Sequence, residues 1–422
     1  MRTCGSLWVC RWVLVVSLAG VWGCDQQAPV QPDVSLSAEG LGRITQLMEE
    51  EVEQSKLAGA VAMVAVGGQV VYEQAVGHRD REAAVDMSAD TIFRIASMTK
   101  PVTSVAVMIL YDEGKIALDD PLSKYIPEFA NPKVLTATGG TVAAEREITI
   151  RDLLTHTSGL GYHWDAGVGP MYNEAGIGHG VGPAEGLLGE KMAKMGAIPL
   201  LFMPGSQFHY SLSVDVLGRV VEVASGQTLA EFMEGRIFKP LGMTDTFFFV
   251  PQDKLDRLAV AYAPAEGGGL KRLGNEALTE GLLVYGAAHP YEGERRYYSG
   301  GGGLCSTAGD YLRFAQMLAN GGTLDGKRIL KGETVAMMTT DQVGERWQGG
   351  EGFGLGFGVA RDTPAAAEMG CVGSYGWGGF WYTTFFVDPA RNIVGVCMGQ
   401  LHPAGPSKLN GEFKRLVYQA VE

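Results

Sequence analysis

A serine and a lysine lie three positions apart at the start of an apolar segment of this chain. Residues 93–100 read Phe-Arg-Ile-Ala-Ser-Met-Thr-Lys, which places Ser97 just before Lys100. On a helix, residues three positions apart share a face, so the lysine amine would lie beside the serine hydroxyl. A serine hydroxyl becomes a good nucleophile when a neighbouring base removes its proton, and a desolvated amine can be that base. The spacing therefore predicts that Ser97 is a nucleophile and that Lys100 helps to activate it.

The segment that follows this pair favours catalysis over packing alone. Residues 99–112 are largely apolar and are followed by Gly114, a pattern that predicts a buried helix with a glycine stop. Packing alone does not explain the positive charge of Lys100 at the start of a buried helix. The helix N-terminus does, however, stabilise negative charge that develops on a nucleophile such as Ser97. The sequence has no G-x-S-x-G motif, which argues against the nucleophile elbow of an α/β-hydrolase.

No metal-binding or phosphate-binding pattern accompanies the pair. The chain has 7 histidines and 6 cysteines but neither an H-E-x-x-H nor a C-x-x-C motif. The glycine run 300–303 lacks P-loop spacing and a Lys-Ser/Thr pair, so it is interpreted as a turn rather than a phosphate cradle. We therefore expect neither a metal nor a cofactor. The cysteines are too few for a disulfide scaffold, and we expect Cys305, Cys371 and Cys397 to be buried thiols, with a single disulfide as the alternative.

Strand patterns at both ends of the chain, with helical patterns between them, predict the elements that position the pair. Residues 38–56 and 407–421 have helical spacing, and 58–66 and 69–76 flank Gly67-Gly68 as in a β-hairpin. Helical pieces broken by Gly- and Pro-rich loops, such as 159–187 and 264–274, fill most of 116–290. From about residue 296 β signals return, at 300–303, 353–360, 380–387 and 393–399.

These patterns predict one α+β domain that is built from both ends of the chain. It would comprise residues 38–115 and 296–422, with a mostly helical domain, 116–295, inserted between them. With 46% hydrophobic and 19% charged residues, the composition excludes a disordered chain. A net charge of −13 argues against a nucleic-acid partner.

The N-terminus has the pattern of an export signal. Residues 1–24 contain two arginines and the apolar run 12–22, which is too short to span a bilayer. The run ends in Gly23-Cys24, which resembles a bacterial lipoprotein cleavage box. We expect a signal peptide at 1–24, a lipid on Cys24 and a tether at 25–37. The protein would then be lipid-anchored at the cell envelope, on the periplasmic side, or secreted, with no contact to a membrane except through Cys24.

Several further segments accompany 93–100 in order: His-Thr-Ser-Gly-Leu at 156–160, Pro204-Gly205 leading to Tyr210-Ser211, Pro-Leu-Gly-Met-Thr at 240–244, and 302–310. With these segments the chain resembles the serine hydrolase superfamily of class C β-lactamases, DD-peptidases and family VIII carboxylesterases, from about Ile44 to the C-terminus. The resemblance implies a β-lactamase-like fold, with an antiparallel sheet flanked by helices, in which the α+β domain and a helical domain enclose the site. It also implies acyl transfer through a covalent ester of Ser97.

The resemblance assigns a role to Tyr210. In the superfamily a tyrosine after this Pro-Gly turn hydrogen-bonds the nucleophile, and it acts first as a base and then as a proton donor to the leaving group. The motif usually continues to an asparagine that touches the substrate amide of a β-lactam. This chain has Leu212 at that position, and a leucine cannot make that hydrogen bond.

The resemblance also places an oxyanion hole and a substrate-binding segment at 376–380. β-Lactamases and DD-peptidases carry a lysine or histidine there, whereas this chain reads Gly-Trp-Gly-Gly-Phe. Trp377 has ring area and one N–H but no charge. The backbone N–H groups of Ser97 and Phe380 would form the oxyanion hole, and Trp377, Gly378 and Gly379 would contact substrate. The Trp-Gly-Gly pattern, together with Met-Gly-Gln-Leu at 398–401 and Pro403, favours the family VIII esterase branch.

The remaining histidines and carboxylates of the matching segments are interpreted as structural. His156 is expected in a core or a turn. His209 would point away from Tyr210 if this piece is extended, although it could still modulate the site. Asp152, Asp215 and Asp310 are interpreted as helix caps or packing residues.

The function that these observations favour is hydrolysis of a small carboxylic ester, with Ser97 as nucleophile and with Lys100 and Tyr210 as general base and acid. Three alternatives remain. The chain could be a β-lactamase or DD-peptidase, an acyltransferase to an alcohol, or a non-catalytic binding protein on this fold. Trp377 and Leu212 argue against the first alternative, and the presence of Ser97, Lys100 and Tyr210 together argues against the last. The sequence assigns no oligomeric state.

Overall fold

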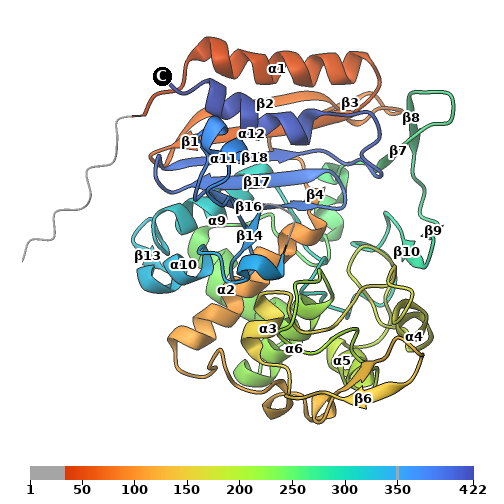
Figure 1. Cartoon of the computed structure of the whole chain (residues 1–422). Coiled ribbons are helices and arrows are strands. Elements are labelled where there is room, and N and C mark those ends of the chain that lie inside the picture. Colours follow the sequence, from red (N-terminus) through yellow and green to blue (C-terminus); the bar gives the residue numbers. More distant parts are fainter. Residues whose placement is uncertain (1–33, 348–350) are drawn as a thin grey trace, which may run out of the picture. The chain divides into compact units, whose positions relative to one another are not determined.

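The computed structural model describes residues 34–347 and 351–422 (Figure 1). The expected signal peptide 1–24, Cys24 and most of the expected tether 25–37 lie outside the described residues. Within the described residues, no helix is both long enough and apolar enough to cross a membrane.

An antiparallel sheet of eight strands organises the fold, in the order β14-β15-β16-β17-β18-β1-β2-β3. The two ends of the chain meet in it, because β1 pairs with β18 from Val61 opposite Met398 to Val66 opposite Ile393. This confirms the α+β fold that was expected from both termini. The strands are β1 (Gly59–Val66), β2 (Gln69–Asp80), β3 (Val85–Asp86), β14 (Gly352–Phe353), β15 (Gly358–Val359), β16 (Tyr375–Gly379), β17 (Thr383–Asp388) and β18 (Ile393–Met398).

The β1–β2 hairpin follows directly from its turn residues. Gly67 and Gly68 have backbone φ values of 58° and 84°, a conformation that glycine adopts without steric cost. The predicted hairpin is therefore correct, although β2 runs four residues beyond the predicted 69–76. Strand β1 is almost wholly buried because helices cover both faces of the sheet.

Two helices from opposite ends of the chain cover one face of the sheet, and a third helix lies on the second face (Figure 1). Helix α1 (Ala38–Glu53) packs beside α12 (Leu409–Gln419) on the first face, with Ile44, Met48 and Phe413 in a shared apolar cluster. Helix α9 (Ala308–Ala319) packs on β1, β17 and β18 from the other side. Each layer buries the apolar stripe of its helices against the sheet.

Helix α2 (Thr99–Asp112) runs through the core, with the bounds that the sequence predicts. Every residue from Thr99 to Leu110 is buried, as expected for a helix that is apolar on all sides. The chain leaves it at Gly114, with a φ of 70°. Truncating a fully buried side chain such as Leu110 to alanine is expected to cost about 2–5 kcal/mol. The residues at the N-terminus of α2, including Lys100, are therefore fixed in place by the packing of this helix in the core.

The middle of the chain contains the expected helices and, in addition, three short antiparallel hairpins. Each of these strands has only three residues, too few for a period-two pattern to show in the sequence. The helices are α3 (Ile150–Leu154), α4 (Gly169–Glu174), α5 (Leu188–Gly196), α6 (Ser213–Ser225), α7 (Leu229–Met233) and α8 (Lys239–Leu241), with 3-10 turns at Leu122–Lys124, Pro127–Phe129 and Gln252–Arg257 and a π-helical turn at Glu234–Phe238. The hairpins are β5 (Lys133–Leu135) with β6 (Thr141–Ala143), β7 (Tyr262–Pro264) with β8 (Leu270–Arg272), and β9 (Leu278–Glu280) with β10 (Leu283–Tyr285).

The glycine run 300–303 is a turn, as interpreted from the sequence. One strand prediction in the C-terminal part was wrong in detail. The single strand expected at 353–360 is two short strands, β14 and β15. Gly356 lies between them with a φ of 101°, and a Cβ there would come within 2.2 Å of Ser104 Oγ. The remaining elements of this part are β4 (Phe93–Arg94) with β11 (Cys305–Ser306), β12 (Thr323–Leu324) with β13 (Lys327–Arg328), α10 (Gly332–Met338), a 3-10 turn at Gly344–Arg346 and α11 (Pro364–Met369).

Candidate active site

Ser97 lies in a short 3-10 helix, Ala96–Met98, that leads directly into α2. Of residues 91–100, Ser97 is the one that is partly exposed, while its neighbours are buried. Ala96 has a backbone φ of 43°, in the left-handed region, which costs a residue with a Cβ about 1–2 kcal/mol. A hydrophobic cluster that includes Ala96 and Trp381 holds this conformation. The fold therefore exposes one hydroxyl at the head of a rigid core helix.

Lys100 is 1% exposed and uses all of its hydrogen-bonding capacity inside the protein. Its Nζ donates to Ser97 Oγ at 3.3 Å, to the Tyr162 hydroxyl at 3.0 Å and to the Gly301 carbonyl at 2.6 Å. An ammonium has three N–H donors, so each has an acceptor. The three contacts fix the amine beside the Ser97 hydroxyl, as the spacing in the sequence predicts.

Tyr210, from the middle of the chain, contacts Ser97. Its hydroxyl donates to Ser97 Oγ at 2.7 Å, and Lys100 Nζ lies 4.7 Å from the centre of its ring. The Ser97 oxygen thus has a phenol and an amine within hydrogen-bond distance. Proton transfer from a nucleophile requires this reach, about 2.6–3.2 Å between heavy atoms and often somewhat longer in a free site.

Two backbone hydrogen bonds place Tyr210. The Gly205 N–H donates to the Thr157 carbonyl at 2.7 Å, and the His209 N–H donates to the His156 carbonyl at 2.8 Å. Gly205 has a φ of 83°, which a residue with a side chain rarely adopts. The Pro-Gly turn and the 156–160 segment therefore form one unit that holds Tyr210 against Ser97.

Tyr162 belongs to the same cluster, and the sequence analysis did not identify it. It is buried, accepts a hydrogen bond from Lys100, and stacks between Trp164 and Tyr210, with ring centres 4.1 Å and 5.5 Å apart. Burial and the nearby Tyr210 raise the pKa of Tyr162 well above 10, so it stays a neutral phenol. An aromatic residue two positions after the 156–160 segment was the only sequence signal for it.

Asp215, which the sequence analysis interpreted as a helix cap or a packing residue, is buried near the site. It lies in the first turn of α6, is fully buried, and accepts a hydrogen bond from the Ser299 hydroxyl. Burial raises the pKa of Asp215, whereas the Lys100 charge and the Ser299 hydrogen bond oppose that rise. Its second carboxylate oxygen has no hydrogen-bond partner within the described residues. Asp215 also lies close to Lys100, since a Cβ on Gly301 would be 2.2 Å from Asp215 Oδ2 and 3.5 Å from Lys100 Nζ. It is thus a buried packing residue beside Lys100 rather than a helix cap.

His156 and His209 lie near the tyrosines of the site: His156 packs against Tyr210, and His209 pairs with a residue that holds the Tyr162 backbone. His156 is buried, its Nδ1 lies 3.2 Å from Ser211 Oγ, and its ring centre lies 4.8 Å from that of Tyr210. Burial and the Lys100 charge lower the pKa of His156 well below 6.5, so it is neutral. The Nε2 atom of His209 pairs with Asp165 Oδ2 at 3.0 Å. Asp165 also accepts a hydrogen bond from the Tyr162 N–H, so this pair braces the loop that carries Tyr162.

The end of strand β16 approaches Ser97 closely. A Cβ on Gly379 would lie 2.3 Å from the Ile95 carbonyl, so only glycine fits there. Phe380 follows the strand and is partly exposed. The hydrogen bonds of residues 34–347 and 351–422 give its N–H no acceptor in the protein. An N–H that is free in this way can donate to a ligand beside Ser97.

Trp377 lies on strand β16 and packs against Tyr210. Its ring centre is 5.6 Å from that of Tyr210 and 5.2 Å from that of Phe353. Gly378, next to it, is exposed. The structure thus brings Ser97, Lys100, Tyr210 and the 377–380 segment together, and the wall beside them is aromatic.

The other predicted structural residues lie away from Ser97. Asp152 forms a capping box with Thr149 at the start of α3. Asp310 accepts from the Asp245 N–H and the Thr246 hydroxyl, while Thr307 caps α9. The cysteines of the described residues, Cys305, Cys371 and Cys397, are all buried and unpaired.

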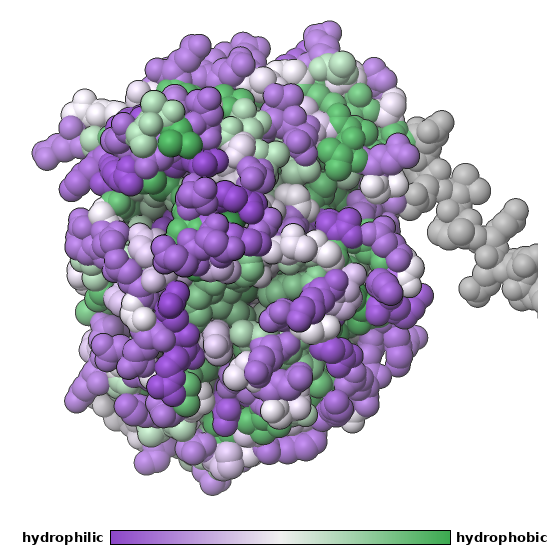
Figure 2. Space-filling view, turned by 180° about the vertical axis from the view of Figure 1, so that it is seen from behind, coloured by the Kyte–Doolittle hydropathy of each residue, from purple (hydrophilic) through white to green (hydrophobic). Residues whose placement is uncertain are grey.

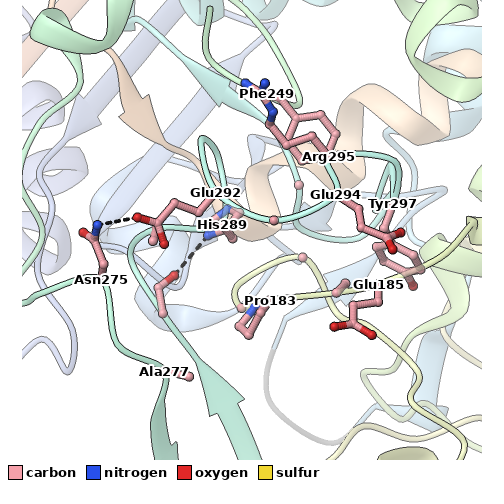
Figure 3. A pocket seen from close by; sticks show the side chains of 17 residues that line it. Pro183, Glu185, Phe249, Asn275, Ala277, His289, Glu292, Glu294, Arg295 and Tyr297 are labelled. Atoms are coloured by element: carbon pink, nitrogen blue, oxygen red, sulfur yellow. Dashed lines mark hydrogen bonds between the residues drawn. The ribbon is translucent and has the colours of Figure 1, made fainter. Parts of the chain in front are cut away.

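A separate cavity of about 510 Å³ lies between the 180–185 and 286–297 loops (Figure 3). His289 faces it from one side and Pro183 and Glu185 from the other, and Ser97 does not line it. On the face seen in Figure 2, hydrophilic residues surround a recess whose floor is more hydrophobic.

Within the described residues there is no group of three or more His, Cys, Asp or Glu side chains that could hold a metal ion.

Comparison with known proteins places this geometry among relatives. A family model described as Beta-lactamase matches residues 44–419. The chain is 38% identical to "Esterase EstB" of Burkholderia gladioli, over 85% of this chain and 90% of that protein. It is 37% identical to "Protein Rv1367c" of Mycobacterium tuberculosis (strain ATCC 25618 / H37Rv), over 82% of this chain and 86% of that protein.

Among solved structures the chain is similar to "EstCE1, a hydrolase with promiscuous acyltransferase activity". The TM-score is 0.78 and the identity 29%, and the match covers 90% of this chain and 99% of that one. The similarity therefore extends over both the sheet and the middle of the chain.

Proposed function

The chain belongs to the β-lactamase family and is a serine esterase, and we propose that Ser97, Lys100 and Tyr210 carry out its reaction. The observation that carries this proposal is the pair of contacts on Ser97 Oγ, 2.7 Å from the Tyr210 hydroxyl and 3.3 Å from Lys100 Nζ. Tyr162 does not compete for the role of base, because burial keeps its phenol neutral.

In the first half of the reaction, Ser97 Oγ attacks the carbonyl carbon of a carboxylic ester. In this proposal Tyr210 acts in its deprotonated form beside the Lys100 ammonium, and its oxygen accepts the Ser97 proton. The tetrahedral intermediate then collapses, the C–O bond to the alcohol breaks, and Tyr210 returns the proton to the departing alkoxide, which leaves as an alcohol. The product on the enzyme is an acyl ester of Ser97.

The backbone N–H groups of Ser97 and Phe380 form the oxyanion hole in this proposal. The negative charge of the tetrahedral intermediate develops on the former carbonyl oxygen. Fixed donors that point at that oxygen stabilise the intermediate without reorganising. The free Phe380 N–H and the close approach of Gly379 to Ile95 support this placement.

In the second half, water attacks the acyl ester and Tyr210 takes its proton. The bond between the acyl carbon and Ser97 Oγ then breaks, the proton returns to Ser97 Oγ, and the carboxylic acid leaves. An alcohol in place of water would give transesterification by the same steps, which makes acyl transfer the second candidate function. The name of the neighbour EstCE1, a hydrolase with promiscuous acyltransferase activity, supports keeping it. Competition between water and an added alcohol for the acyl enzyme separates the two.

We propose that esters are preferred over β-lactams because Trp377 occupies the position of the family's lysine or histidine. A tryptophan offers no charge to the carboxylate of a penicillin. Its packing against Tyr210 and Phe353 supports an uncharged, aromatic wall for substrate. Trp377, Gly378 and Gly379 would contact the ester on this side.

The test uses p-nitrophenyl butyrate and a chromogenic cephalosporin side by side on residues 25–422, with Ser97→Ala as control. The proposal expects ester turnover that disappears in Ser97→Ala and little or no opening of the cephalosporin. Efficient lactam opening would assign the chain to the β-lactamase branch instead. Ester turnover that survives Ser97→Ala would refute the role of Ser97.

We also propose how the chain is organised and where it acts. Residues 1–24 would be a lipoprotein-type signal peptide, Cys24 the lipidated residue and 25–37 a tether, so that the enzyme acts at the cell envelope. Residues 38–115 and 296–422 would form the α+β domain around an insert at 116–295, which the pairing of β1 with β18 supports. Fractionation of cells that express the full chain tests the anchor: Cys24→Ala should move the enzyme out of the membrane fraction, and an unchanged distribution would contradict the lipid anchor.

A further inference from the structure

His402 lies directly against the residue that carries the proposed oxyanion-hole donor. Its ring stacks on the ring of Phe380, with centres 3.5 Å apart and planes 21° apart. The His402 N–H donates to the Tyr262 carbonyl at 2.9 Å, and the Leu401 N–H donates to the Trp381 carbonyl at 3.1 Å. The backbone at 401–402 is therefore tied both to strand β7 and to the residue after Phe380.

Both nitrogens of the His402 ring face acceptors. The Nδ1 atom lies 3.3 Å from the Phe380 carbonyl oxygen, and the Nε2 atom lies 3.2 Å from Glu280 Oε2. A neutral imidazole has one N–H and can donate to only one of them, whereas the cation donates to both. The side chain thus connects the Phe380 carbonyl to strand β9, which carries Glu280.

The same hairpin holds Phe380 from a second direction. Tyr285, on strand β10, makes edge-to-face contacts with Phe380 and with His402, with ring centres 5.3 Å and 5.1 Å apart. Aromatic pairs with this geometry are favourable beyond the area that they bury. Phe380 therefore has a histidine on its face, a tyrosine at its edge and a hydrogen bond to its carbonyl.

These contacts to the ring and carbonyl of Phe380 matter because its N–H is a proposed donor to the oxyanion. A residue inside the sheet is oriented by ladder hydrogen bonds on its N–H and carbonyl. Phe380 lies beyond the last residue of β16, and its N–H has no acceptor in the described protein. This N–H lies in the peptide plane that it shares with the Gly379 carbonyl, which accepts from the Tyr382 N–H at 3.1 Å. Contacts to the Phe380 ring and carbonyl fix the other side of that plane through the φ of Phe380.

We propose that His402, oriented by Glu280, is a positioning residue that holds Phe380 so that its N–H points into the oxyanion hole. The inference rests on the proposed function, because it assigns the Phe380 N–H to the tetrahedral intermediate. It predicts that His402 matters more in the transition state than in the bound substrate. A donor that is misplaced by a fraction of an ångström stabilises the anion less, while the uncharged ester binds almost as before.

The experiment compares His402→Ala, His402→Phe and Glu280→Gln with the purified wild-type enzyme. His402→Phe keeps an aromatic ring against Phe380 but removes both polar contacts, so it separates stacking from hydrogen bonding. The matched control is His78→Gln. Nε2 of His78 also faces a carboxylate, Asp86 at 3.7 Å, but on strands β2 and β3 at the far edge of the sheet.

Three quantities are measured for each variant: kcat and KM on p-nitrophenyl butyrate, inhibition by an alkylboronic acid, and Tm. A boronic acid adds to the Ser97 oxygen and becomes a tetrahedral anion, so its affinity reports the oxyanion hole without turnover. We expect His402→Ala to lower kcat and boronate affinity by about 10- to 100-fold, less than removing a donor outright. KM and Tm should stay close to wild type, Glu280→Gln should show a smaller loss, and His78→Gln should show none.

An unchanged kcat in His402→Ala would overturn the inference. So would a fall in kcat that comes with a fall in Tm and leaves boronate affinity intact, because that result describes a structural residue. Ser97→Ala distinguishes these failures from failure of the proposed function. If Ser97→Ala is inactive while His402→Ala is fully active, only the role of His402 is lost.

Discussion

Lys100 Nζ donates a hydrogen bond of 3.0 Å to the hydroxyl of Tyr162, a buried phenol that stays neutral. This contact orients an amine that has four rotatable bonds above it. The ring of Tyr162 also stacks against Tyr210, so one side chain contacts both residues that share the proton of Ser97. The Ser97 site is therefore held by a third residue that need not touch substrate.

Tyr162→Phe is expected to lower kcat while leaving the fold intact. The variant keeps the stacked ring and removes only the oxygen that accepts from Lys100. A hydrogen bond to a charged group contributes about 1.5–3 kcal/mol, so kcat should fall by about 10-fold or more if the bond is needed in the transition state. Ester kinetics together with Tm checks this, and an unchanged kcat would show that Tyr162 is only a packing residue.

Ser97→Ala should abolish ester hydrolysis, with a loss of about 10⁴-fold or more, because the hydroxyl is the proposed nucleophile. Lys100→Ala and Tyr210→Phe should each cost about 10²–10⁴-fold, the usual contribution of a positioned acid or base. The double variant should be little worse than the single ones, because the two side chains act on one proton. Additive losses, measured as kcat/KM, would contradict a shared role.

Asp215→Asn tests whether the Asp215 carboxylate acts as a counter-charge to the Lys100 ammonium. An asparagine can still accept from the Ser299 hydroxyl, so the packing around α6 should survive. The neutral amide no longer attracts the Lys100 ammonium, and we expect the acidic limb of the kcat/KM profile to move to lower pH. A profile that keeps its wild-type position would mean that Asp215 has only a structural role.

Trp377→Ala should raise KM for an aromatic ester by about 2- to 12-fold, since an aromatic contact contributes about 0.5–1.5 kcal/mol beyond its area. Trp377→Phe should retain most of the affinity, because it keeps a ring against Tyr210 and Phe353. Comparison of p-nitrophenyl and ethyl esters of one acid gives the measurement. Equal effects on both esters would argue against an aromatic subsite.

The extent to which the sequence predicts this molecule follows the range of the interactions involved. The bounds of α2 and the β1–β2 turn were predictable because an apolar run and two glycines determine them locally. The Ser97–Lys100 pair was predictable for the same reason, since one helical turn sets its geometry. Tyr210 and the 376–380 segment came from resemblance to a family rather than from spacing.

The supporting residues could not be predicted because distant segments bring them together. Tyr162 reaches Lys100 across 62 positions, and Asp215 is placed by α6 packing on α2. A lone tyrosine or aspartate in a sequence has many structural roles, so only the folded contacts identify these two. The hairpin β9–β10 was missed for a different reason, since strands of three residues have no readable period.

Acid should weaken the segment that carries His156 and Tyr162 through Asp152. This carboxylate accepts from Arg146 at 2.6 and 2.9 Å, from the Thr149 N–H at 2.9 Å and from the Thr157 hydroxyl at 3.1 Å. Burial alone would raise the pKa of Asp152, but the hydrogen bonds from Arg146 and Thr149 outweigh it and lower the pKa below 3.8.

Because the pKa of Asp152 is lower in the folded protein than in the unfolded chain, its contribution to stability is complete above the unfolded value of about 3.9. The contribution is lost as the pH falls through the lower, folded pKa. Asp152→Asn should therefore reduce the free energy of unfolding at neutral pH by about 1–3 kcal/mol, since it leaves Arg146 without its carboxylate. In strong acid the wild-type carboxyl is itself protonated, and the two proteins should converge. Urea unfolding at several pH values measures the difference, and a gap that stays constant down to strong acid would show that the charge of Asp152 does not stabilise this segment.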